Sequence, residues 1–318
     1  MPATADSILP RILVLVGPTC SGKTTISLGL ATQLNGEIIS ADSRQIYKYL
    51  DVGTAKPPPA ERAAIKHHFV DDLLPDQEFN AGEFGRRGRE VVARIFRQQR
   101  LPIVAGGSGL YIRSLIDGFF EGPGADEGFR VAMEKHVNAG NIGYLLEELK
   151  KVDPVSASTI DPTKPRRIIR ALEVHHLTGQ PLSKLHRERK VQVGFHPVLF
   201  GLRWKREELY KRIELRCDGM IANGLLKEVE HLATMGYSDS QNALNTVGYA
   251  ESFAYRRGEI SSDEFVRLFK QNSRRYAKRQ LTWFKRDQRI KWVRMGGEKT
   301  SDIVIQEIVD KFSPSTPR

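Results

Sequence analysis

The sequence predicts an α/β protein in which helices flank a parallel β-sheet and a helical subdomain interrupts the sheet-forming part of the chain. Three observations support this fold class. Residues 12–16 form an unbroken run of Ile, Leu and Val, which is typical of a strand buried on both faces of a parallel sheet. Strand-like and helix-like segments then alternate as far as Gly107. From about Glu121 to His196 the pattern is mostly helical, with no buried strand.

The elements of the first part follow in a regular order. A Gly-rich turn separates the first strand from a helix at 25–34, whose apolar residues have helical spacing and which Asn35-Gly36 would end as a C-cap. The remaining elements are a short strand at 37–40, an ambiguous segment at 65–70, an amphipathic helix at 84–99 and a buried strand at 102–105. Because α/β sheets bind ligands at the carboxyl ends of their strands, we expect the turns after the three strands to meet at one edge.

A break at Gly122-Pro123-Gly124 divides the chain. We expect 1–121 to form the first part of the α/β core, 122–195 to form the helical insertion, and 196–318 to return to the core. The return begins with a strand at 196–204 and ends with a short strand at 290–293. Between them, 265–286 has the spacing of a helix with an apolar face and a basic face. The basic face carries Arg267, Lys270, Arg274, Lys278 and Lys285, a stripe that can follow an RNA backbone.

The composition favours an anionic partner in a reducing compartment. The 318 residues include 49 Lys and Arg against 38 Asp and Glu, a formal net charge of +11. Such an excess fits a nucleic acid, an anionic membrane surface or a polyanionic small molecule, although many cytosolic proteins are basic without binding nucleic acid. Cys20 and Cys217 have no disulfide or metal-ligand spacing. The early apolar run is too short to span a bilayer, so we expect a cytoplasmic protein without a membrane partner.

The turn after the first strand carries a complete phosphate-binding motif, the P-loop. It fits the pattern G-x-x-x-x-G-K-[ST] and consists of Gly17, Pro18, Thr19, Cys20, Ser21, Gly22, Lys23 and Thr24. Glycines let backbone N–H groups curl around phosphate oxygens at a helix N-terminus. Lys23 adds a positive charge, and the Thr24 hydroxyl can hold Mg²⁺. The sequence therefore predicts a P-loop NTPase-like fold and a site for a di- or triphosphate.

The P-loop alone does not identify the phosphate compound. Most P-loops hold ATP or GTP and have an acidic Mg²⁺ ligand at the end of a second long apolar strand. Here Val104 is followed by Ala105 and two glycines rather than by an acid. This argues against an ATPase motor or a switch GTPase and leaves a small-molecule kinase as an alternative.

Asp42 follows the second predicted strand, where a general base would face the P-loop across the ligand pocket. Beside it, Arg44 and Gln45 have side chains of the types that read the edges of nucleic-acid bases. The simpler interpretation is that Asp42 and Ser43 only cap the next turn or helix. Spacing alone leaves both interpretations open.

Several blocks, spread in order over almost the whole chain, resemble those of the tRNA dimethylallyltransferases, also called tRNA isopentenyltransferases. They are the P-loop, Asp42-Ser43-Arg44-Gln45-Ile46-Tyr47, Asp51-Val52-Gly53-Thr54-Ala55-Lys56-Pro57, His67-His68-Phe69-Val70-Asp71, Gly106-Gly107-Ser108-Gly109-Leu110-Tyr111, residues 166–174 and residues 274–284. No zinc-finger signature follows the core, which favours the bacterial type of this family.

The resemblance implies a specific reaction. The P-loop would hold the diphosphate of dimethylallyl diphosphate, and the acceptor would be N6 of the adenosine 3′ of the anticodon, position 37, in tRNAs reading UNN codons. Lys23 and Mg²⁺ on Thr24 would neutralise the leaving diphosphate, and Asp42 would be the base. Ser108 stands where most family members have Thr. Its hydroxyl can still bond the diphosphate, although with a looser rotamer.

The resemblance also assigns residues to the tRNA anticodon stem-loop. They are Asp42, Ser43, Arg44, Gln45, Ser108, Arg130, Arg166, Arg167, Ile168, Ile169 and Arg170. Three arginines within 166–170 could meet phosphates or a splayed loop base. Taken alone, such a cluster is more typical of a solvated helix face. We expect the protein to act as a monomer.

Three other function classes remain open from the sequence. A prenyltransferase acting on free adenine nucleotides would have similar active-site motifs, but it would not need the helical insertion or the arginines at 166–170. A small-molecule kinase would use the same fold and consume ATP. A non-enzymatic RNA-binding module would leave Lys23, Thr24 and Asp42 without a purpose.

Overall fold

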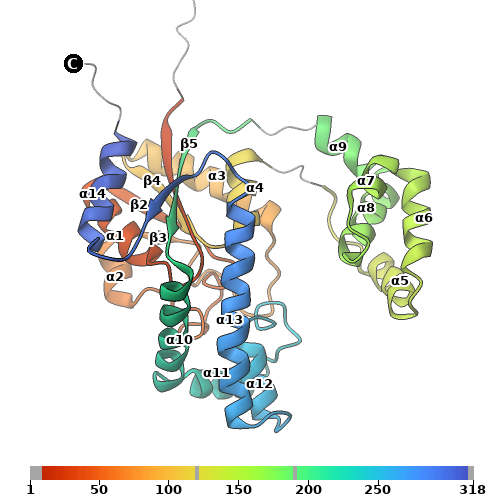
Figure 1. The fold of residues 1–318 in the computed structure, drawn as a ribbon. Helices are drawn as coiled ribbons and strands as arrows, with labels where there is room; N and C mark the ends of the chain where they lie inside the picture. Colours follow the sequence, from red (N-terminus) through yellow and green to blue (C-terminus); the bar gives the residue numbers. More distant parts are fainter. Residues whose placement is uncertain (1–8, 119–121, 189–191, 314–318) are drawn as a thin grey trace, which may run out of the picture. The chain divides into compact units, whose positions relative to one another are not determined.

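The computed structural model describes residues 9–118, 122–188 and 192–313. The chain divides into two compact units, one made of 1–116 and 193–318 and the other of 117–192 (Figure 1). The insertion predicted at 122–195 overlaps the smaller unit, with both predicted boundaries a few residues later in the chain. The predicted fold class, a P-loop NTPase-like parallel sheet with flanking helices and a helical insertion, is confirmed.

Within the described residues, the larger unit contains one sheet of six parallel strands in the order β3-β2-β4-β1-β5-β6. The strands are β1 (Arg11–Val16), β2 (Gly36–Ala41), β3 (His67–His68), β4 (Leu101–Gly106), β5 (His196–Arg203) and β6 (Lys291–Arg294). Gly106 at the end of β4 is level with Val16 of β1 and with Ala41 of β2. The turns after these three neighbouring strands therefore leave the sheet side by side, as the sequence predicts.

Helices cover the sheet and extend beyond it. They are α1 (Lys23–Gln33), α2 (Pro59–Ala64), α3 (Ala81–Arg97), α4 (Gly109–Asp117), α10 (Arg206–Ala222), α11 (Leu225–Thr234), α12 (Tyr249–Arg256), α13 (Ser262–Phe284) and α14 (Ser301–Phe312). Leu13 and Leu15 of β1 pack in one core cluster with Ile26 of α1 and Val304 of α14. The alternate residue Val14 is also fully buried, so both faces of β1 are covered. In Figure 1, α10 to α13 extend from one end of the sheet.

Local differences from the sequence prediction are small and have local causes. Gly36 is the first residue of β2 and not part of a helix cap, because α1 already ends at Gln33, with Leu34 as its C-cap. Asn35 alone makes the turn between them, with a positive φ of 49°. The ambiguous segment at 65–70 contains the two-residue strand β3, which pairs with Ile38 and Ile39 at the sheet edge.

The smaller unit is helical throughout its described elements. These are α5 (Glu127–Asn138), α6 (Ile142–Val152), α7 (Pro154–Thr159), α8 (Pro165–Thr178) and α9 (Leu182–Glu188). Its core joins Leu145 and Leu149 of α6 to Ile168, Ile169 and Leu172 of α8. The spacing of four residues on α6, and of three and four on α8, is that of an apolar stripe facing a partner helix.

A buried carboxylate organises one end of this unit. The Glu173 side chain is fully buried and accepts hydrogen bonds from Arg130 Nε at 2.8 Å, Arg170 Nη1 at 2.6 Å and the backbone N–H of Asp126 at 2.8 Å. Burial opposes its charge, but the bonds from the two arginines and the backbone hold the pKa of Glu173 below its ordinary value. Arg170 also donates to the Pro123 carbonyl at 2.9 Å. This network ties α5, α8 and the start of the unit together.

Replacing Glu173 with Gln should destabilise the smaller unit selectively. Removing the buried carboxylate weakens its charge-assisted hydrogen bonds to two arginines, each 35% exposed, and to the Asp126 N–H, and the combined loss is about 3 kcal/mol. In native-state hydrogen exchange of the full chain, α8 amides should exchange about 100-fold faster while β1 amides are unchanged. Because the Glu173 pKa is lowered on folding, its contribution is present above about pH 4 and is lost as the pH falls below it.

Glu127→Gln is the matched control. Glu127 also pairs with Arg130, at 3.3 Å, but its side chain is 69% exposed. It should therefore change α8 exchange less than about threefold. Equal effects of the two substitutions would show that Glu173 does not organise the unit.

Candidate functional site

The P-loop between β1 and α1 has the strained backbone that its cradle shape requires. Gly22 precedes the first residue of α1 with φ 92°, and Cys20 also has a positive φ, 63°. These conformations turn the loop around the N-terminus of α1, where backbone N–H groups have no helical partner. The Ser21 hydroxyl is fully buried, and no described atom forms a hydrogen bond with it. The P-loop therefore offers donors that can bind a phosphate group.

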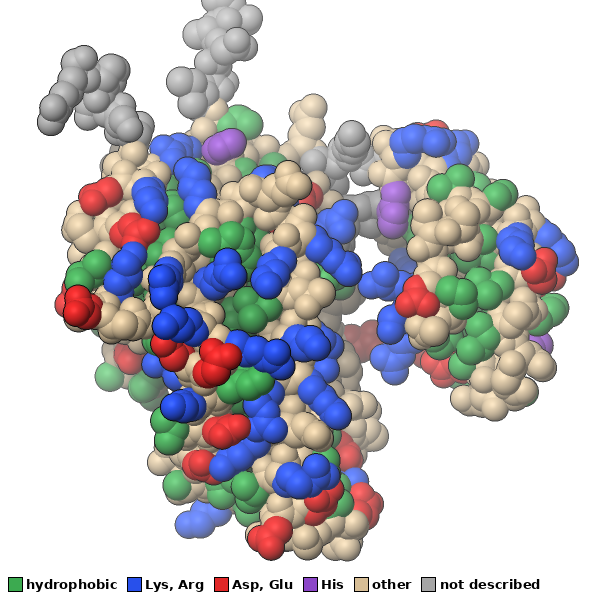
Figure 2. All heavy atoms as spheres, viewed as in Figure 1, with side chains coloured by type: hydrophobic (Ala, Val, Ile, Leu, Met, Phe, Trp, Pro, Cys, Tyr) green, Lys and Arg blue, Asp and Glu red, His purple; other side chains and the backbone are tan. Residues whose placement is uncertain are grey.

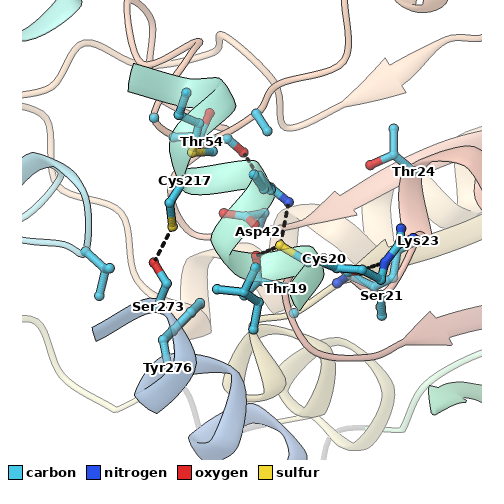
Figure 3. Close-up of a pocket in the computed structure, with 18 of the residues that line it drawn as sticks. Thr19, Cys20, Ser21, Lys23, Thr24, Asp42, Thr54, Cys217, Ser273 and Tyr276 are labelled. Atoms are coloured by element: carbon cyan, nitrogen blue, oxygen red, sulfur yellow. Dashed lines mark hydrogen bonds between the residues drawn. The ribbon is translucent and has the colours of Figure 1, made fainter. Parts of the chain in front are cut away.

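The P-loop forms one side of a cavity of about 470 Å³. In Figure 3, Lys23 and Thr24 lie on the P-loop side, Ser273 and Tyr276 come from α13, and Asp42 is drawn between the two groups. The remaining lining is partly apolar, with Ile213, Leu215, Met220, Val247 and Phe269 among its residues. A polyphosphate end and a hydrocarbon or base end can therefore be accommodated in one cavity.

The electrostatics of this cavity centre on Lys23. Its ammonium donates to the carbonyls of Gly17 at 3.0 Å and Pro18 at 2.7 Å. Burial lowers the pKa of Lys23 to about 8, Asp42 opposes this shift, and the positive charge of Arg216 adds to it. A bound polyanion would favour the charged form. Both Lys23 and Arg216 line the same cavity.

The structure brings Asp42, Ser43 and Ser108 together at the strand ends. Asp42 Oδ1 accepts from the backbone N–H of Arg44 at 2.9 Å, and Asp42 also lines the cavity. Asp42 therefore caps the turn and also faces the P-loop across the cavity, so both interpretations of this residue fit the structure. Ser108 Oγ accepts from the backbone N–H of Ser43 at 3.0 Å. The Ser108 hydroxyl thus joins the turn after β4 to the turn after β2, and Ser108 is not among the residues that line the cavity.

The side-chain amide of Gln45 is hydrogen-bonded within the protein. Its Nε2 donates to the carbonyls of Thr54 at 3.3 Å and Ala55 at 3.4 Å, and its Oε1 accepts from Ser40. Gln45 lines the cavity, but its amide is used to hold the loop that contains Thr54. Arg44 also lines the cavity.

Gln280 is a site residue that sequence reasoning missed. Its Oε1 accepts from the backbone N–H of Thr19 in the P-loop at 2.8 Å, and its Nε2 donates to the Gly107 carbonyl at 3.0 Å. The side chain of this α13 residue is buried, so both bonds are protected from water. The available signal was its spacing, because Gln280 falls on the buried stripe that contains Phe269 and Ala277. An amide in such a stripe needs buried hydrogen-bond partners.

Two residues from the helices after β5 were also missed. Arg216 of α10 donates to the Thr54 carbonyl at 3.3 Å and approaches Cys20 Sγ at 3.9 Å, so it adds a second cation beside the P-loop. Glu228 of α11 accepts from the backbone N–H groups of residues 51, 52 and 53 at 2.8, 2.7 and 3.0 Å. The Tyr249 hydroxyl donates to the same carboxylate at 2.6 Å. No local sequence signal marks these long-range contacts.

The bonds of Glu228 to this loop and to Tyr249 account for several residues of the sequence block at 51–57. A Cβ on Gly53 would lie 2.5 Å from the Tyr249 ring, so only glycine permits the loop to approach α12. Lys56 is buried, donates to the Tyr47 carbonyl at 2.9 Å and forms ion pairs with Asp51 and Asp71. The block thus positions the Thr54 wall of the cavity.

The structure corrects part of the tRNA-binding prediction for the insertion. The side chains of Ile168 and Ile169 are 0% and 4% exposed and belong to the core of the smaller unit. Their assignment to a ligand surface is therefore wrong for these side chains, because α8 turns that face toward α6. Arg130 and Arg170 are bonded to Glu173, so they have a structural role in the smaller unit. Arg166 and Arg167 are exposed on α8.

The predicted basic stripe of α13 also divides into two groups. Arg267, Lys270 and Arg274 form ion pairs with Glu264, Asp218 and Glu214, respectively. Only the C-terminal half of the stripe, Lys278 and Lys285, has no ion pair within the described part of the chain. Neutralisation by nearby acids reduces what the first half can contribute to RNA binding.

A metal ion at this site would be held mostly by the phosphate oxygens of the bound substrate and by water. Among the described residues, no group of three or more His, Cys, Asp or Glu side chains could hold one. The Thr24 hydroxyl, exposed in the first turn of α1 beside the P-loop, fits the sparse protein ligation that Mg²⁺ accepts when phosphate oxygens and water complete its shell.

The fold and the site together define a P-loop enzyme of the α/β class, with a phosphate cradle facing a carboxylate across a partly apolar cavity. The sequence model of the IPP transferase family matches residues 45–287, and the chain belongs to this family.

Similar proteins agree with this assignment. The chain is 42% identical over 299 residues to a protein from Pelotomaculum thermopropionicum named tRNA dimethylallyltransferase, covering 93% of this chain and 95% of that one. It is 45% identical over 287 residues to tRNA dimethylallyltransferase 1 from Pelobacter propionicus, covering 90% and 93%. The crystal structure of a full-length tRNA isopentenylpyrophosphate transferase from Bacillus halodurans has 37% identity and a TM-score of 0.71, covering 95% of each chain.

In residues 9–118, 122–188 and 192–313, no helix is long and apolar enough to cross a membrane. The cytoplasmic location and the monomeric state stay predictions.

Binding of inorganic pyrophosphate should weaken as the pH rises through about 8. The Lys23 ammonium, whose pKa is about 8, must be charged to pair with the ligand. Each pH unit above that value should therefore cost up to about tenfold in affinity. Isothermal titration calorimetry in Mg²⁺-free buffer from pH 6.5 to 9.5 measures this, with Lys23→Gln as the reference for titration of the ligand itself. A wild-type-to-variant affinity ratio that stays constant over this range would contradict the assignment.

Proposed function

We propose that this protein transfers a dimethylallyl group from dimethylallyl diphosphate to N6 of the adenosine at position 37 of tRNAs reading UNN codons, releasing diphosphate. The observation that carries the proposal is the single cavity that combines a phosphate cradle, an apolar wall and Asp42. Membership of the IPP transferase family and the names of the similar proteins support the same reaction.

The P-loop side of the cavity would hold the diphosphate. Backbone N–H groups at the start of α1, the buried Ser21 hydroxyl and the ammonium of Lys23 provide donors, and Arg216 adds positive charge from α10. When Mg²⁺ is bound, Thr24 would hold it, and the ion would supply further neutralisation of the leaving group. The apolar residues of α10 and α13 would surround the hydrocarbon chain and exclude water from C1.

The transfer is a substitution at C1 of the prenyl group. The N6 nitrogen of adenosine forms the new bond to C1, and the C1–O bond breaks with its electron pair on the diphosphate. The proton lost from N6 passes to the Asp42 carboxylate. The products are N6-dimethylallyladenosine in the RNA, diphosphate and one proton. Positive groups placed where the leaving diphosphate gains charge lower the barrier, and Asp42 orients the amine that attacks.

The direct test is mass spectrometry of a UNN-reading tRNA incubated with the protein, Mg²⁺ and dimethylallyl diphosphate, with AMP as a competitor. We expect a dimethylallyl mass increment on the adenosine 3′ of the anticodon and unmodified AMP. Prenylated AMP with unmodified RNA would instead assign the protein to free-nucleotide prenylation. No product on either acceptor would contradict the proposal.

Substitutions of Asp42 should separate its role as a turn cap from its role as a base. Asp42→Asn can still accept the Arg44 N–H through its amide oxygen, but it cannot take a proton. We expect kcat to fall by about 10²- to 10⁴-fold while pyrophosphate affinity stays within about threefold. Asp42→Ala removes the turn bond as well and should lower thermal stability by about 1 kcal/mol more than Asn does. If the Asp42→Asn variant is as active as the wild type, Asp42 only caps the turn and does not act as the base.

A further inference from the structure

Arg216 of α10 has different partners from other cations at the end of the larger unit that α10 to α13 form. In Figure 2, Asp and Glu side chains lie among the Lys and Arg side chains over this end. Lys270 and Arg274 of α13, for example, pair with acids of α10. Within the described part of the chain, Arg216 pairs with no carboxylate, and its bonds go to the Thr54 carbonyl and to the weakly accepting sulfur of Cys20. The orientation of this guanidinium therefore depends on where the Thr54 carbonyl lies.

The position of the Thr54 carbonyl is set by the loop at 51–56. This loop folds back on itself through two internal backbone hydrogen bonds, both at 3.0 Å. Thr54 is buried, and its hydroxyl donates to the Leu50 carbonyl at 2.5 Å. The loop is therefore a compact unit, and a group that fixes its first residues also fixes Thr54.

Glu228 of α11 holds the first residues of this loop. Its Oε2 accepts from the N–H groups of residues 51 and 52, and its Oε1 accepts from the N–H of Gly53 and from the Tyr249 hydroxyl. Three consecutive backbone N–H groups thus converge on one carboxylate, and hydrogen bonds to an ionised acceptor are strong. Glu228 is not among the residues that line the P-loop cavity, so it can affect a ligand there only through the loop.

We infer that Glu228 is a positioning residue for the diphosphate site, because it holds the Thr54 carbonyl where this carbonyl directs Arg216 toward the P-loop. Arg216 then meets the diphosphate with its guanidinium already oriented, which reduces the ordering cost of binding and of charge stabilisation. The effect on catalysis rests on the proposed function. The effect on diphosphate binding does not, because it can be measured with inorganic pyrophosphate and without an acceptor.

Glu228→Gln is the informative substitution because it keeps the shape of the side chain and changes one acceptor atom into a donor. An amide nitrogen in place of Oε2 would face two backbone N–H groups. In place of Oε1 it would face only the Gly53 N–H, and the Tyr249 hydroxyl can turn to accept from it. We therefore expect the variant to lose the Gly53 bond, which is the one next to Thr54. Arg216 should then lose its fixed orientation and keep its charge.

Two other substitutions serve as matched controls. Tyr249→Phe breaks one bond to the same carboxylate but leaves the three backbone bonds in place, so it should destabilise the protein without releasing the loop. Glu230→Gln removes a charge from the same helix, where the exposed Glu230 pairs with Arg256 at 2.7 Å. Thermal unfolding of the full-length variants measures how far each is destabilised and confirms that each is folded at the assay temperature.

Affinity for inorganic pyrophosphate, measured by isothermal titration calorimetry, should fall about tenfold in the Glu228→Gln variant and stay within about twofold of the wild type in both controls. In an Arg216→Met background, the further loss caused by Glu228→Gln should be less than about twofold, because the two residues act through one chain of contacts. In the transfer assay, Glu228→Gln should lower kcat/KM for dimethylallyl diphosphate and leave KM for tRNA unchanged.

The pH profile of pyrophosphate binding separates positioning from a general loosening of the site. Burial is the main cause of the lowered Lys23 pKa; Asp42 and Cys20 oppose it, and Arg216 adds to it. If Arg216 turns away in the Glu228→Gln variant, the pKa of Lys23 rises, and the decline of affinity should begin at a higher pH than the wild-type value of about 8. A midpoint that stays at the wild-type pH would contradict the inference.

The inference and the proposed function fail in different ways. If Glu228→Gln and Tyr249→Phe weaken pyrophosphate binding equally, or if the effects of Glu228→Gln and Arg216→Met add, the positioning role is overturned whether or not tRNA is modified. If the wild type modifies no tRNA but Glu228→Gln weakens pyrophosphate binding only when Arg216 is present, the proposed function fails and the positioning role stands.

Discussion

The close approach of the β4 end to its two neighbours is the constraint on which the site depends. A Cβ on Gly106 would lie 2.1 Å from the Ala41 carbonyl oxygen, and one on Gly107 would lie 2.2 Å from the Gln280 amide. The Ala41 backbone cannot move away from such a contact without separating the strands, and the Gln280 side chain could not move without losing its bonds to the two turns. The absence of side chains at these positions lets the turns after β1, β4 and β2 meet, and Gln280 then joins the P-loop to the β4 turn.

Around this constraint, the charged residues of the chain have two kinds of environment. Glu173, Glu228 and Lys56 are bonded on several sides and fix loops or helices in place. Lys23, Lys278 and Lys285 have no carboxylate bonded to them among the described residues. A protein gains little from such positive charge unless an anion binds. The distribution of paired and unpaired charge therefore separates the residues that hold loops and helices in place from the cations that remain available to an anionic ligand.

The missed and corrected residues show why long-range contacts could not be predicted from the sequence. Arg130 and Arg170 belong to a basic pattern that fits RNA binding, but their partner Glu173 lies 43 residues from Arg130 and is brought to it only by the packing of α5 on α8. Ile168 and Ile169 lie within the same family block and are buried by α6. Arg216 and Glu228 reach the site from helices after β5, so no local spacing could identify them.

The sequence by itself determined the strand pattern, the P-loop, the acidic turn at Asp42 and the family, because these depend on local periodicity and on short motifs with a fixed backbone requirement. Even the position of Gln280 on the buried face of α13 was accessible from helical spacing. Only the tertiary structure decided which cations are free to meet an anion and which already hold a carboxylate. Whether a cation is paired depends on distances between residues far apart in the chain, and the sequence alone does not show which residues will be neighbours.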